Sequence, residues 1–395
     1  MKNCILIIDG AAGLQLPERG GKTCLELADT PNLDAMVKEG VLGLVRTVPQ
    51  GMEPSSACAC MSILGYDPKV YYQGRAAIEA RSMGIDIDDG EVVLRCNLVA
   101  VRDGKMWSYS SGYISTGEAQ QLVEALNQSL GCDHVHFYPG VSYRHICKLK
   151  GWENILLATC TPPHDIPHKP VADFLPKGPG SELLRELMAS SEAVFSNHPV
   201  NVARRSRGDI PVTMIWLFWG SGQLPDMPPL KQIYGVNAAM TSGVDLLRGL
   251  ARMLGMKFLE IPGVTDGLDN DYVAQASGAL EALNEYDLVV IHIEAPDEAA
   301  HDGAIDDKID AIQRIDKEVI GRLRTWRPGN LRMLIMPDHP TPIETQTHSS
   351  DPVPFLLWGP GFTANGAERL TEAEAQSTGF FIEEGYNIMG RLIKR

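Results

Sequence analysis

The chain has 395 residues, a net charge of −15 and 44% hydrophobic residues, which suffices for a large core. It shows no basic stripe of the kind that nucleic-acid-binding proteins carry, and no stretch nears the roughly 20 apolar residues that span a membrane. The apolar run ILII near the start ends at Asp9, which argues against a signal peptide. We therefore expect a cytoplasmic protein that binds neither nucleic acid nor membrane.

The eight cysteines all lie within the first 160 residues and form no C-x-x-C pair. In a long chain without a signal peptide, this pattern is typical of reduced thiols. Cys58 and Cys60 are two residues apart, which does not match a common zinc knuckle. We expect both to be packing residues.

Short apolar strands alternate with amphipathic helices along most of the chain. NCILIID and VLGLVRTV are predicted strands on either side of the helix TPNLDAMVKEG, which begins at a Thr cap and ends at Gly40. Further on, GVDLLRGLARMLG and KIDAIQRIDKEVIGRLRTW are predicted helices. DLVVIHI, LRMLIMPD and PVPFLLWG are predicted buried strands. The alternation predicts an α/β fold with a mostly parallel sheet covered by helices on both faces.

The middle of the chain has a different pattern. EVVLRCNLVAVRDGKMWSYSS and HVHFYPGVSYRHICKLKG are hairpin-like, and the helix TGEAQQLVEALNQSLG lies between them. We predict that residues 89–206 form a smaller, inserted α+β domain. Residues 1–88 and 207–395 are then expected to form the core.

Acidic and imidazole side chains follow the predicted strands where each strand ends. Sites in open α/β sheets form outside the carboxyl ends of strands, so these side chains are expected to meet at one edge. Asp297 and His301 are four residues apart, share one face of a helical turn and can hold one cation. Taken singly, each residue has an ordinary role at a helix end or turn. Together they predict a site for two divalent ions, with imidazole favouring manganese or zinc. The predicted ligands are Asp9, Asp297, His301, Asp338, His339 and His348.

The stretch EPSSACACMSILGYDP places two serines after the second predicted strand, at the start of a helix. A serine beside two metal ions suits phosphoryl transfer, because it can act as a metal-activated nucleophile. The start of the helix would also favour an anion. The alternative is that Ser55 or Ser56 is an ordinary helix N-cap.

Basic residues are expected to bind the negative groups of a substrate, since Arg recognises carboxylate and phosphate with two parallel hydrogen bonds. Arg75 follows the serine segment closely and is the strongest candidate. GVSYRHI adds Arg144 and His145. HPVNVARRSRG adds Arg204, in a cluster that is equally consistent with a solvated face.

On these residues the chain resembles the archaeal-type cofactor-independent (2,3-bisphosphoglycerate-independent) phosphoglycerate mutases of the alkaline phosphatase superfamily. The resemblance covers almost the whole chain. Among the segments that carry it are IIDGAAG, SILGYDPKVYYQGRAAIEA, LRCNLVAV, APDEAAHDG and DHPTPIETQTHSSDPVPFLLWGP.

The resemblance implies an alkaline-phosphatase-like core with two divalent ions, manganese first and zinc, cobalt or magnesium as alternatives. One ion would be held by Asp297, His301 and His348, and the other by Asp9, Asp338 and His339 with the nucleophilic serine. The family pattern Pro-Gly-Ser-Asp-x-Ala-Asn places that serine at Ser56. In this chain, Ala57 and Cys60 stand where the family has Asp and Asn.

The implied reaction interconverts 3-phosphoglycerate and 2-phosphoglycerate through a phosphoserine, with the inserted domain as a lid hinged near residues 88 and 206. Alternatives remain open because of the altered serine segment. They are a homoserine kinase-like phosphotransferase, a metal-dependent phosphatase or phosphodiesterase, and a metal-binding regulator without turnover. A G-x-x-x-x-G-K-[ST] loop is absent, so an ATP site of that kind is not expected. The sequence does not indicate an oligomeric state.

Overall fold

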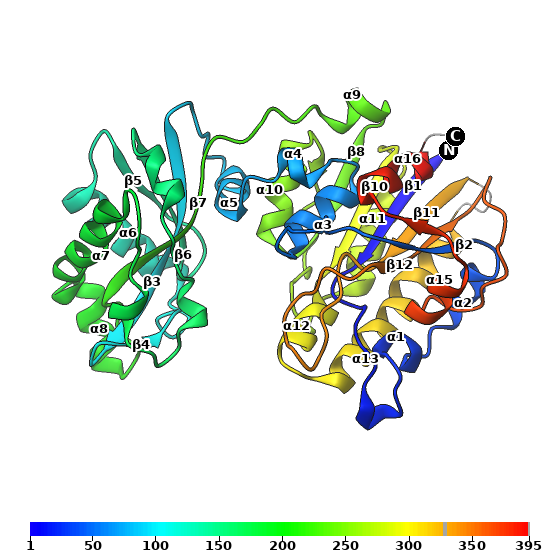
Figure 1. Ribbon diagram of the computed structural model, residues 1–395, viewed down its shortest axis with the longest axis horizontal. Coiled ribbons are helices and arrows are strands. Elements are labelled where there is room, and N and C mark those ends of the chain that lie inside the picture. The colour runs from blue at the N-terminus through cyan, green and yellow to red at the C-terminus, as the bar shows by residue number, and fades with distance from the viewer. Residues whose placement is uncertain (327–329, 394–395) are drawn as a thin grey trace. The chain divides into compact units, whose positions relative to one another are not determined.

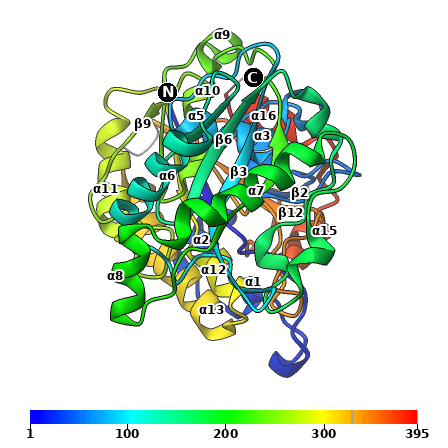
Figure 2. The ribbon, with the colours of Figure 1, turned by 90° about the vertical axis from the view of Figure 1, so that its left-hand side faces the viewer.

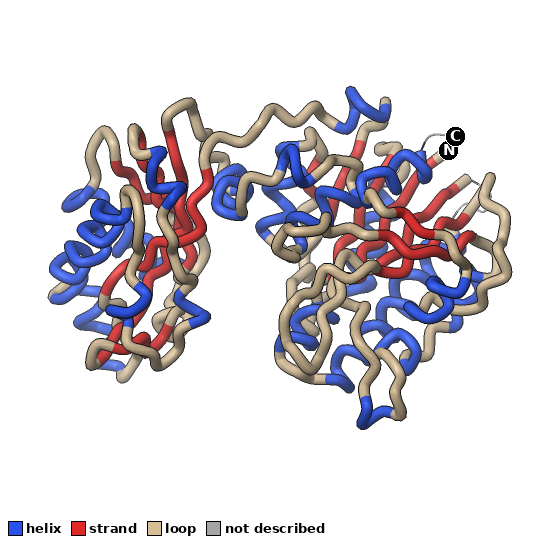
Figure 3. The backbone as a smooth tube through the Cα atoms, viewed as in Figure 1, coloured by secondary structure: helices blue, strands red, loops and turns tan. Residues whose placement is uncertain are grey.

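The computed structural model describes residues 1–326 and 330–393. The chain divides into two compact units, each built around its own sheet (Figures 1 and 3). The first unit comprises Met1–Tyr72 and Pro225–Arg395, and the second comprises Gln73–Leu224. Among the described residues, none of the helices has the length and apolar character needed to cross a bilayer. The cytoplasmic location stays a prediction.

The sheet of the first unit has eight strands in the order β13-β2-β12-β11-β1-β10-β8-β9. All neighbouring strands are parallel except β12, which is antiparallel to both of its neighbours. The prediction of a mostly parallel sheet is therefore confirmed. The strands are β1 (Lys2–Ile8), β2 (Val41–Val45), β8 (Ala238–Thr241), β9 (Lys257–Phe258), β10 (Leu288–Ile293), β11 (Leu331–Met336), β12 (Val353–Trp358) and β13 (Phe381–Ile382).

Helices lie against both faces of this sheet (Figure 1). The central strand β1 is buried from Asn3 to Ile8, as expected for a strand covered on both sides. The helix predicted over residues 308–326 is interrupted by a π-helical turn, Ile315–Ile320. The α-helices are α1 (Cys24–Leu27), α2 (Pro31–Val37), α3 (Ser56–Ile63), α4 (Pro68–Tyr71), α9 (Leu230–Tyr234), α10 (Asp245–Met253), α11 (Tyr272–Ala282), α12 (Ala295–His301), α13 (Ile305–Arg314), α14 (Gly321–Thr325), α15 (Glu372–Ser377) and α16 (Ile388–Ile393).

The second unit is an antiparallel sheet built on the long strand β3, with helices on both faces. Figure 2 shows α6 and α7 in front of β3 and β6, and α5 packs on the opposite face. The strands are β3 (Glu91–Arg102), β4 (Lys105–Ser108), β5 (Val135–Tyr138), β6 (Arg144–Lys150) and β7 (Met214–Ser221). The helices are α5 (Arg75–Ser82), α6 (Thr116–Leu130), α7 (Ser181–Ser196) and α8 (Pro199–Arg207).

The second unit extends beyond the predicted inserted range of 89–206 at both ends. The strand β7, expected in the core, pairs with β3 from Val93 to Val99. The helix α5 packs Ala76 and Ala80 against Val93 of β3 and Ile146 of β6. Strand pairing of β7 and packing of α5 therefore place these segments in the second unit. The apolar pattern of β7 could not identify the sheet to which it belongs.

Candidate functional site

Three acidic residues follow the three central strands of the first unit. Ile8 of β1 pairs with Ile293 of β10, so Asp9 and Glu294 come next to each other where these strands end. Asp338 follows β11 on the other side of β1. Asp9 and Asp338 are fully buried, and the Glu294 side chain is 12% exposed. The register of the parallel strands thus gathers these carboxylates at the carboxyl edge of the sheet.

The imidazoles of His301 and His348 converge on Asp297. His301 is one helical turn beyond Asp297 in α12, and its Nε2 lies 3.1 Å from Asp297 Oδ2. His348, from the segment between β11 and β12, has its Nε2 3.5 Å from the same oxygen and 2.9 Å from His301 Nε2. The Nδ1 atoms face the backbone carbonyls of Gln346 and Pro54, at 2.9 and 3.3 Å. Those contacts aim both Nε2 atoms at the carboxylate.

His339 lies between the two groups of side chains. Its Nε2 is 3.3 Å from Asp338 Oδ2 and 3.6 Å from Asp9 Oδ1. It also forms a compact group with Asp297 and His348, whose candidate ligand atoms all lie within 4.8 Å of one another. The structure therefore brings all six predicted ligands together. The compact group around Asp297 consists of Asp297, His339 and His348. The resemblance implies His301 in the place of His339.

Ser55 and Ser56, at the start of α3, have different surroundings. Ser55 is the N-cap of α3, and its Oγ accepts a hydrogen bond from the Cys58 amide at 3.3 Å. Ser56 is the first residue of α3, and its Oγ lies 3.2 Å from His339 Nε2. Ser56 is therefore the serine that faces the histidine and carboxylate cluster, while Ser55 holds the helix start.

The buried carboxylates of the cluster carry negative charge that a bound cation would offset. Asp9 Oδ1 and Glu294 Oε2 are buried without a hydrogen-bond partner in the described structure. Burial and the nearby Asp338 and Asp297 carboxylates raise the pKa of Asp9 well above its usual range, and burial with Asp9 does the same for Glu294. A divalent cation would satisfy these oxygens and offset their mutual repulsion. The donor set of carboxylate and imidazole fits such an ion.

Sequence reasoning missed four residues of this cluster. Thr341 Oγ1 donates a 2.5 Å hydrogen bond to Asp297 Oδ1, and His292 Nε2 lies 2.7 Å from Asp9 Oδ2. Cys60 is fully buried, as expected for a packing residue, and its Sγ also lies 4.0 Å from Asp338 Oδ2. The fourth is Glu294. A histidine and a glutamate at the end of an otherwise apolar strand were the available signal for His292 and Glu294.

Other cysteines behave as expected. Cys58 packs with Val48 and Ala59 in a small buried cluster. All eight cysteines lie within the described residues, and the structure pairs none of them in a disulfide. This agrees with the prediction of reduced thiols.

In the second unit, two arginines and a glutamate form a compact cluster. Glu79 of α5 bridges Arg75 Nε at 2.7 Å and Arg95 Nε at 3.0 Å through its two oxygens. Both guanidinium groups lie over the ring of Trp219, at 5.6 and 5.2 Å from its centroid. Trp219 has a φ of +48°, a conformation that non-glycine residues rarely adopt and that is common at functional sites. Sequence reasoning identified Arg75 but missed Arg95.

Arg144 and His145 are neighbours on β6 and therefore point to opposite faces of the sheet. Arg144 is opposite Asn97, on the face that carries Arg95. His145 is 2% exposed, and its Nδ1 accepts the Gly140 amide at 2.9 Å. Burial lowers the pKa of His145 to about 3, so its imidazole is neutral. The structure thus gives His145 a buried structural role in place of the predicted substrate contact.

Arg204 also differs from the prediction. Its side chain is 95% buried, and its guanidinium pairs with Glu118 Oε2 at 2.7 Å. The remaining nitrogens donate to the carbonyls of Ser111 and Ile210. This network holds the segments around α6 and α8 together. Arg204 therefore has its hydrogen-bonding groups engaged within the fold.

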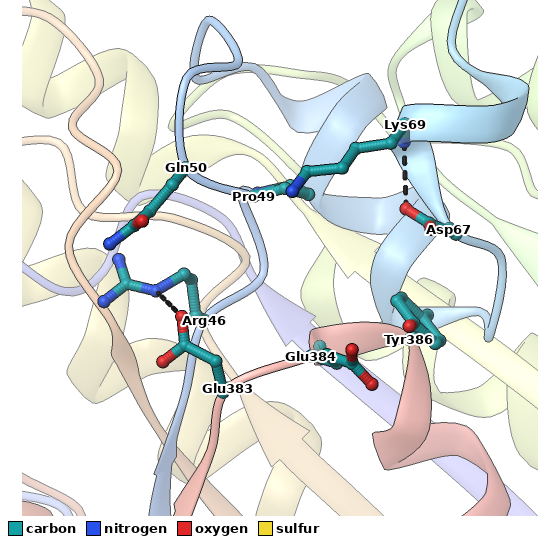
Figure 4. Close-up of a pocket in the computed structure, with 9 residues that line it drawn as sticks. Arg46, Pro49, Gln50, Asp67, Lys69, Glu383, Glu384 and Tyr386 are labelled. Carbon is teal, nitrogen blue, oxygen red and sulfur yellow. Dashed lines mark hydrogen bonds and ion pairs between the residues drawn. The ribbon is translucent and has the colours of Figure 1, made fainter.

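A separate cavity of about 200 Å³ lies in the first unit near Arg46 and Lys69 (Figure 4). Its lining also carries Asp67, Glu383 and Glu384, so it contains side chains of both charges. Arg46 is paired with Glu383 at 3.0 Å. The lining carries more acidic than basic side chains and includes none of the proposed metal ligands, and we assign no reaction to this cavity.

Comparison with known proteins gives consistent matches. A family model described as 2,3-bisphosphoglycerate-independent phosphoglycerate mutase matches residues 37–201. A protein of that name from Methanothrix thermoacetophila is 44% identical over 396 residues, covering 100% of both chains. A solved structure of a Pyrococcus horikoshii protein has a TM-score of 0.83 at 26% identity, over 99% of this chain and 96% of that one. A cofactor-independent phosphoglycerate mutase from Thermoplasma acidophilum shares the fold, with a TM-score of 0.67 at 24% identity over 100% and 99% of the chains.

Proposed function

This chain belongs to the 2,3-bisphosphoglycerate-independent phosphoglycerate mutase family, and we propose that it interconverts 3-phosphoglycerate and 2-phosphoglycerate through a phosphoserine on Ser56. The observation that carries the proposal is the position of Ser56. Its Oγ faces His339 at the centre of the buried carboxylate and imidazole cluster, whereas Ser55 caps the helix.

We propose that the cluster holds two divalent ions, with manganese favoured. Asp297, His301 and His348 would hold one ion, and Asp9, Asp338 and His339 the other beside Ser56, with His339 near both. The ions, when bound, would lower the pKa of the Ser56 hydroxyl and offset charge on the phosphoryl oxygens. The unpartnered Oδ1 of Asp9 supports the second of these assignments.

The chemistry of the chain's own residues then follows in two steps. The Ser56 hydroxyl gives up its proton as Oγ forms a bond to the phosphorus of 3-phosphoglycerate; the bond to the 3-oxygen breaks, and that oxygen takes up a proton. The 2-hydroxyl of the retained glycerate then loses its proton and attacks the same phosphorus. The bond to Oγ breaks, Oγ takes up a proton, and 2-phosphoglycerate is released. Because Ser56 begins α3, the partial positive charge of the helix start favours the phosphoserine.

For the substrate's anionic groups we propose Arg75, Arg95 and Arg144. Glu79 fixes the first two, and Arg144 lies on the same face of the sheet as Arg95. Planar guanidinium groups held by a carboxylate and an aromatic ring are suited to a carboxylate or phosphate. His145 and Arg204 are left out because each is buried in a structural role. That the inserted unit acts as a lid against water stays a prediction.

The test is turnover of 3-phosphoglycerate by the full chain with Mn²⁺, with enolase-coupled detection of 2-phosphoglycerate. We expect Ser56→Ala to abolish turnover. The matched control is Ser55→Ala, which removes an N-cap worth about 0.5–2 kcal/mol of stability but leaves the nucleophile in place. Turnover by Ser56→Ala, or its loss only in Ser55→Ala, would contradict the assignment.

The same preparation separates the alternative reactions. Release of free phosphate from 3-phosphoglycerate without 2-phosphoglycerate would identify a phosphatase. ATP-dependent phosphorylation of homoserine, with no mutase signal, would identify a kinase-like phosphotransferase. Mn²⁺ binding without any turnover would leave only a binding role.

A further inference from the structure

His292 is a fully buried histidine that none of the proposed steps uses. It occupies the next-to-last position of β10, directly beside the proposed metal ligand Asp9. Its Nε2 lies 2.7 Å from Asp9 Oδ2, and its Nδ1 lies 3.1 Å from Ser242 Oγ. Both ring nitrogens therefore have a defined partner.

The partners determine where the imidazole proton resides. A carboxylate that ligates a metal is ionised and can only accept hydrogen bonds. With Asp9 in that state, Nε2 carries the ring proton and donates a hydrogen bond to Oδ2. We assign Nδ1 as the acceptor of the Ser242 hydroxyl. Ser242 Oγ also accepts the Val244 amide at 3.0 Å, which fixes the oxygen in the loop after β8. The hydrogen bonds therefore run from Ser242 to His292 to Asp9.

The backbone of His292 is held as well. Gln275 Nε2 on α11 donates to the His292 carbonyl at 3.0 Å, and Asn270 Nδ2 donates to Gln275 Oε1 at 2.9 Å. All three residues are buried. The ring is thus fixed both at its nitrogens and at its backbone.

We propose that His292 is a positioning residue that holds the Asp9 carboxylate by Oδ2 and so presents Oδ1 to a divalent cation. Oδ1 is the oxygen that is buried without a hydrogen-bond partner. In this role His292 contacts the carboxylate, and the imidazole of the proposed ligand set beside Ser56 is that of His339. The inference rests on the proposed function only in taking Asp9 to be a metal ligand.

The experiment measures Mn²⁺ binding to the metal-free full chain, with free Mn²⁺ followed by electron paramagnetic resonance. His292→Asn can keep the contact to Ser242 but does not reach Asp9, whereas His292→Gln can place an amide donor near Asp9. Loss of a partner that orients a metal ligand weakens metal affinity by roughly 10–100-fold. We expect that loss at one site in His292→Asn and partial recovery in His292→Gln. Ser242→Ala should give a smaller loss.

A matched control is His145→Asn, which alters a buried histidine of the second unit. We expect it to leave Mn²⁺ affinity unchanged. Wild-type Mn²⁺ affinity in folded His292→Asn would overturn the inference. If that variant does not fold, wild-type affinity in Ser242→Ala overturns it. If the wild-type chain does not turn over 3-phosphoglycerate but His292→Asn still weakens Mn²⁺ binding, the proposed function is refuted and this inference stands.

Discussion

Gly10 makes room for the proposed metal ligand Asp297, and Gly10→Ala should therefore damage both stability and metal binding. Gly10 has a φ of +61°, and its amide donates to Asp338 Oδ1 at 3.2 Å. A Cβ at this position would lie 2.3 Å from Asp297 Oδ1 and 2.8 Å from the Asp297 Cα. The Cα belongs to α12, so rotation of the side chain cannot relieve the clash.

The expected magnitude has two parts. A left-handed backbone costs a residue with a Cβ about 1–2 kcal/mol relative to glycine. Overpacking a closely packed site costs about 1–3 kcal/mol more. The free energy of unfolding of the first unit should therefore fall by about 2–5 kcal/mol in Gly10→Ala.

Gly21→Ala is the matched control, because Gly21 has a φ of +72° but nothing within 4 Å of its added Cβ. It should show only the backbone part, about 1–2 kcal/mol. The assay is a urea titration read by pulsed hydrogen exchange in peptides from β1 and β10, together with a Mn²⁺ titration. Equal destabilisation in the two variants, with unchanged Mn²⁺ affinity in Gly10→Ala, would refute the reasoning.

Three further predictions concern both units. Arg204→Met should destabilise the second unit by about 2 kcal/mol, because it removes charge-assisted hydrogen bonds to Glu118 and to the carbonyls of Ser111 and Ile210. It should not raise KM for 3-phosphoglycerate, and a raised KM with unchanged stability would contradict this. Burial opposes ionisation of Glu79, but the charges of Arg95 and Arg75 outweigh it and lower the pKa of Glu79 in the folded protein. The ionised carboxylate therefore contributes to stability above its pKa in the unfolded chain, about 4.3, and this contribution is lost as the pH falls through the lower pKa of the folded state. Urea unfolding of Glu79→Gln should show a shallower loss of stability on the acid side than the wild type does. Mn²⁺ at 100 times its Kd should raise the free energy of unfolding of the first unit by about 2.7 kcal/mol. Calorimetry that shows no fall in Tm when the Mn²⁺ is chelated would count against the metal site.

The sequence predicted the sheet and its ligand-bearing edge because both depend on local signals. Apolar runs identify strands, and a polar residue directly after a run, such as Asp9 or Asp338, marks a strand end. Parallel pairing then brings those ends together, as the register of β1 with β10 and β11 shows. The choice between Ser55 and Ser56 needed the resemblance, since a helix cap and a helix's first residue have the same local pattern.

What the sequence could not provide depends on long-range pairing. The end of the apolar strand marks His292 as unusual, but its role depends on Ser242, which lies 50 residues away in the chain. The pairing of β7 with β3 was hidden, and it moved the boundary of the second unit. By contrast, Arg144 and His145 could have been separated from sequence, because adjacent residues of a strand cannot face the same side.

The order in which the strands are made has a consequence for folding during synthesis. The first strand made, β1, has β10 and β11 as its neighbours in the sheet of the described residues, whereas the second unit is one continuous stretch of chain. At roughly 5–20 residues per second, β1 waits tens of seconds for its partners with an apolar surface exposed. A ribosome stalled well past residue 224 should then carry a protease-resistant second unit and a cleavable β1. Early cleavage throughout residues 73–224 would contradict this order.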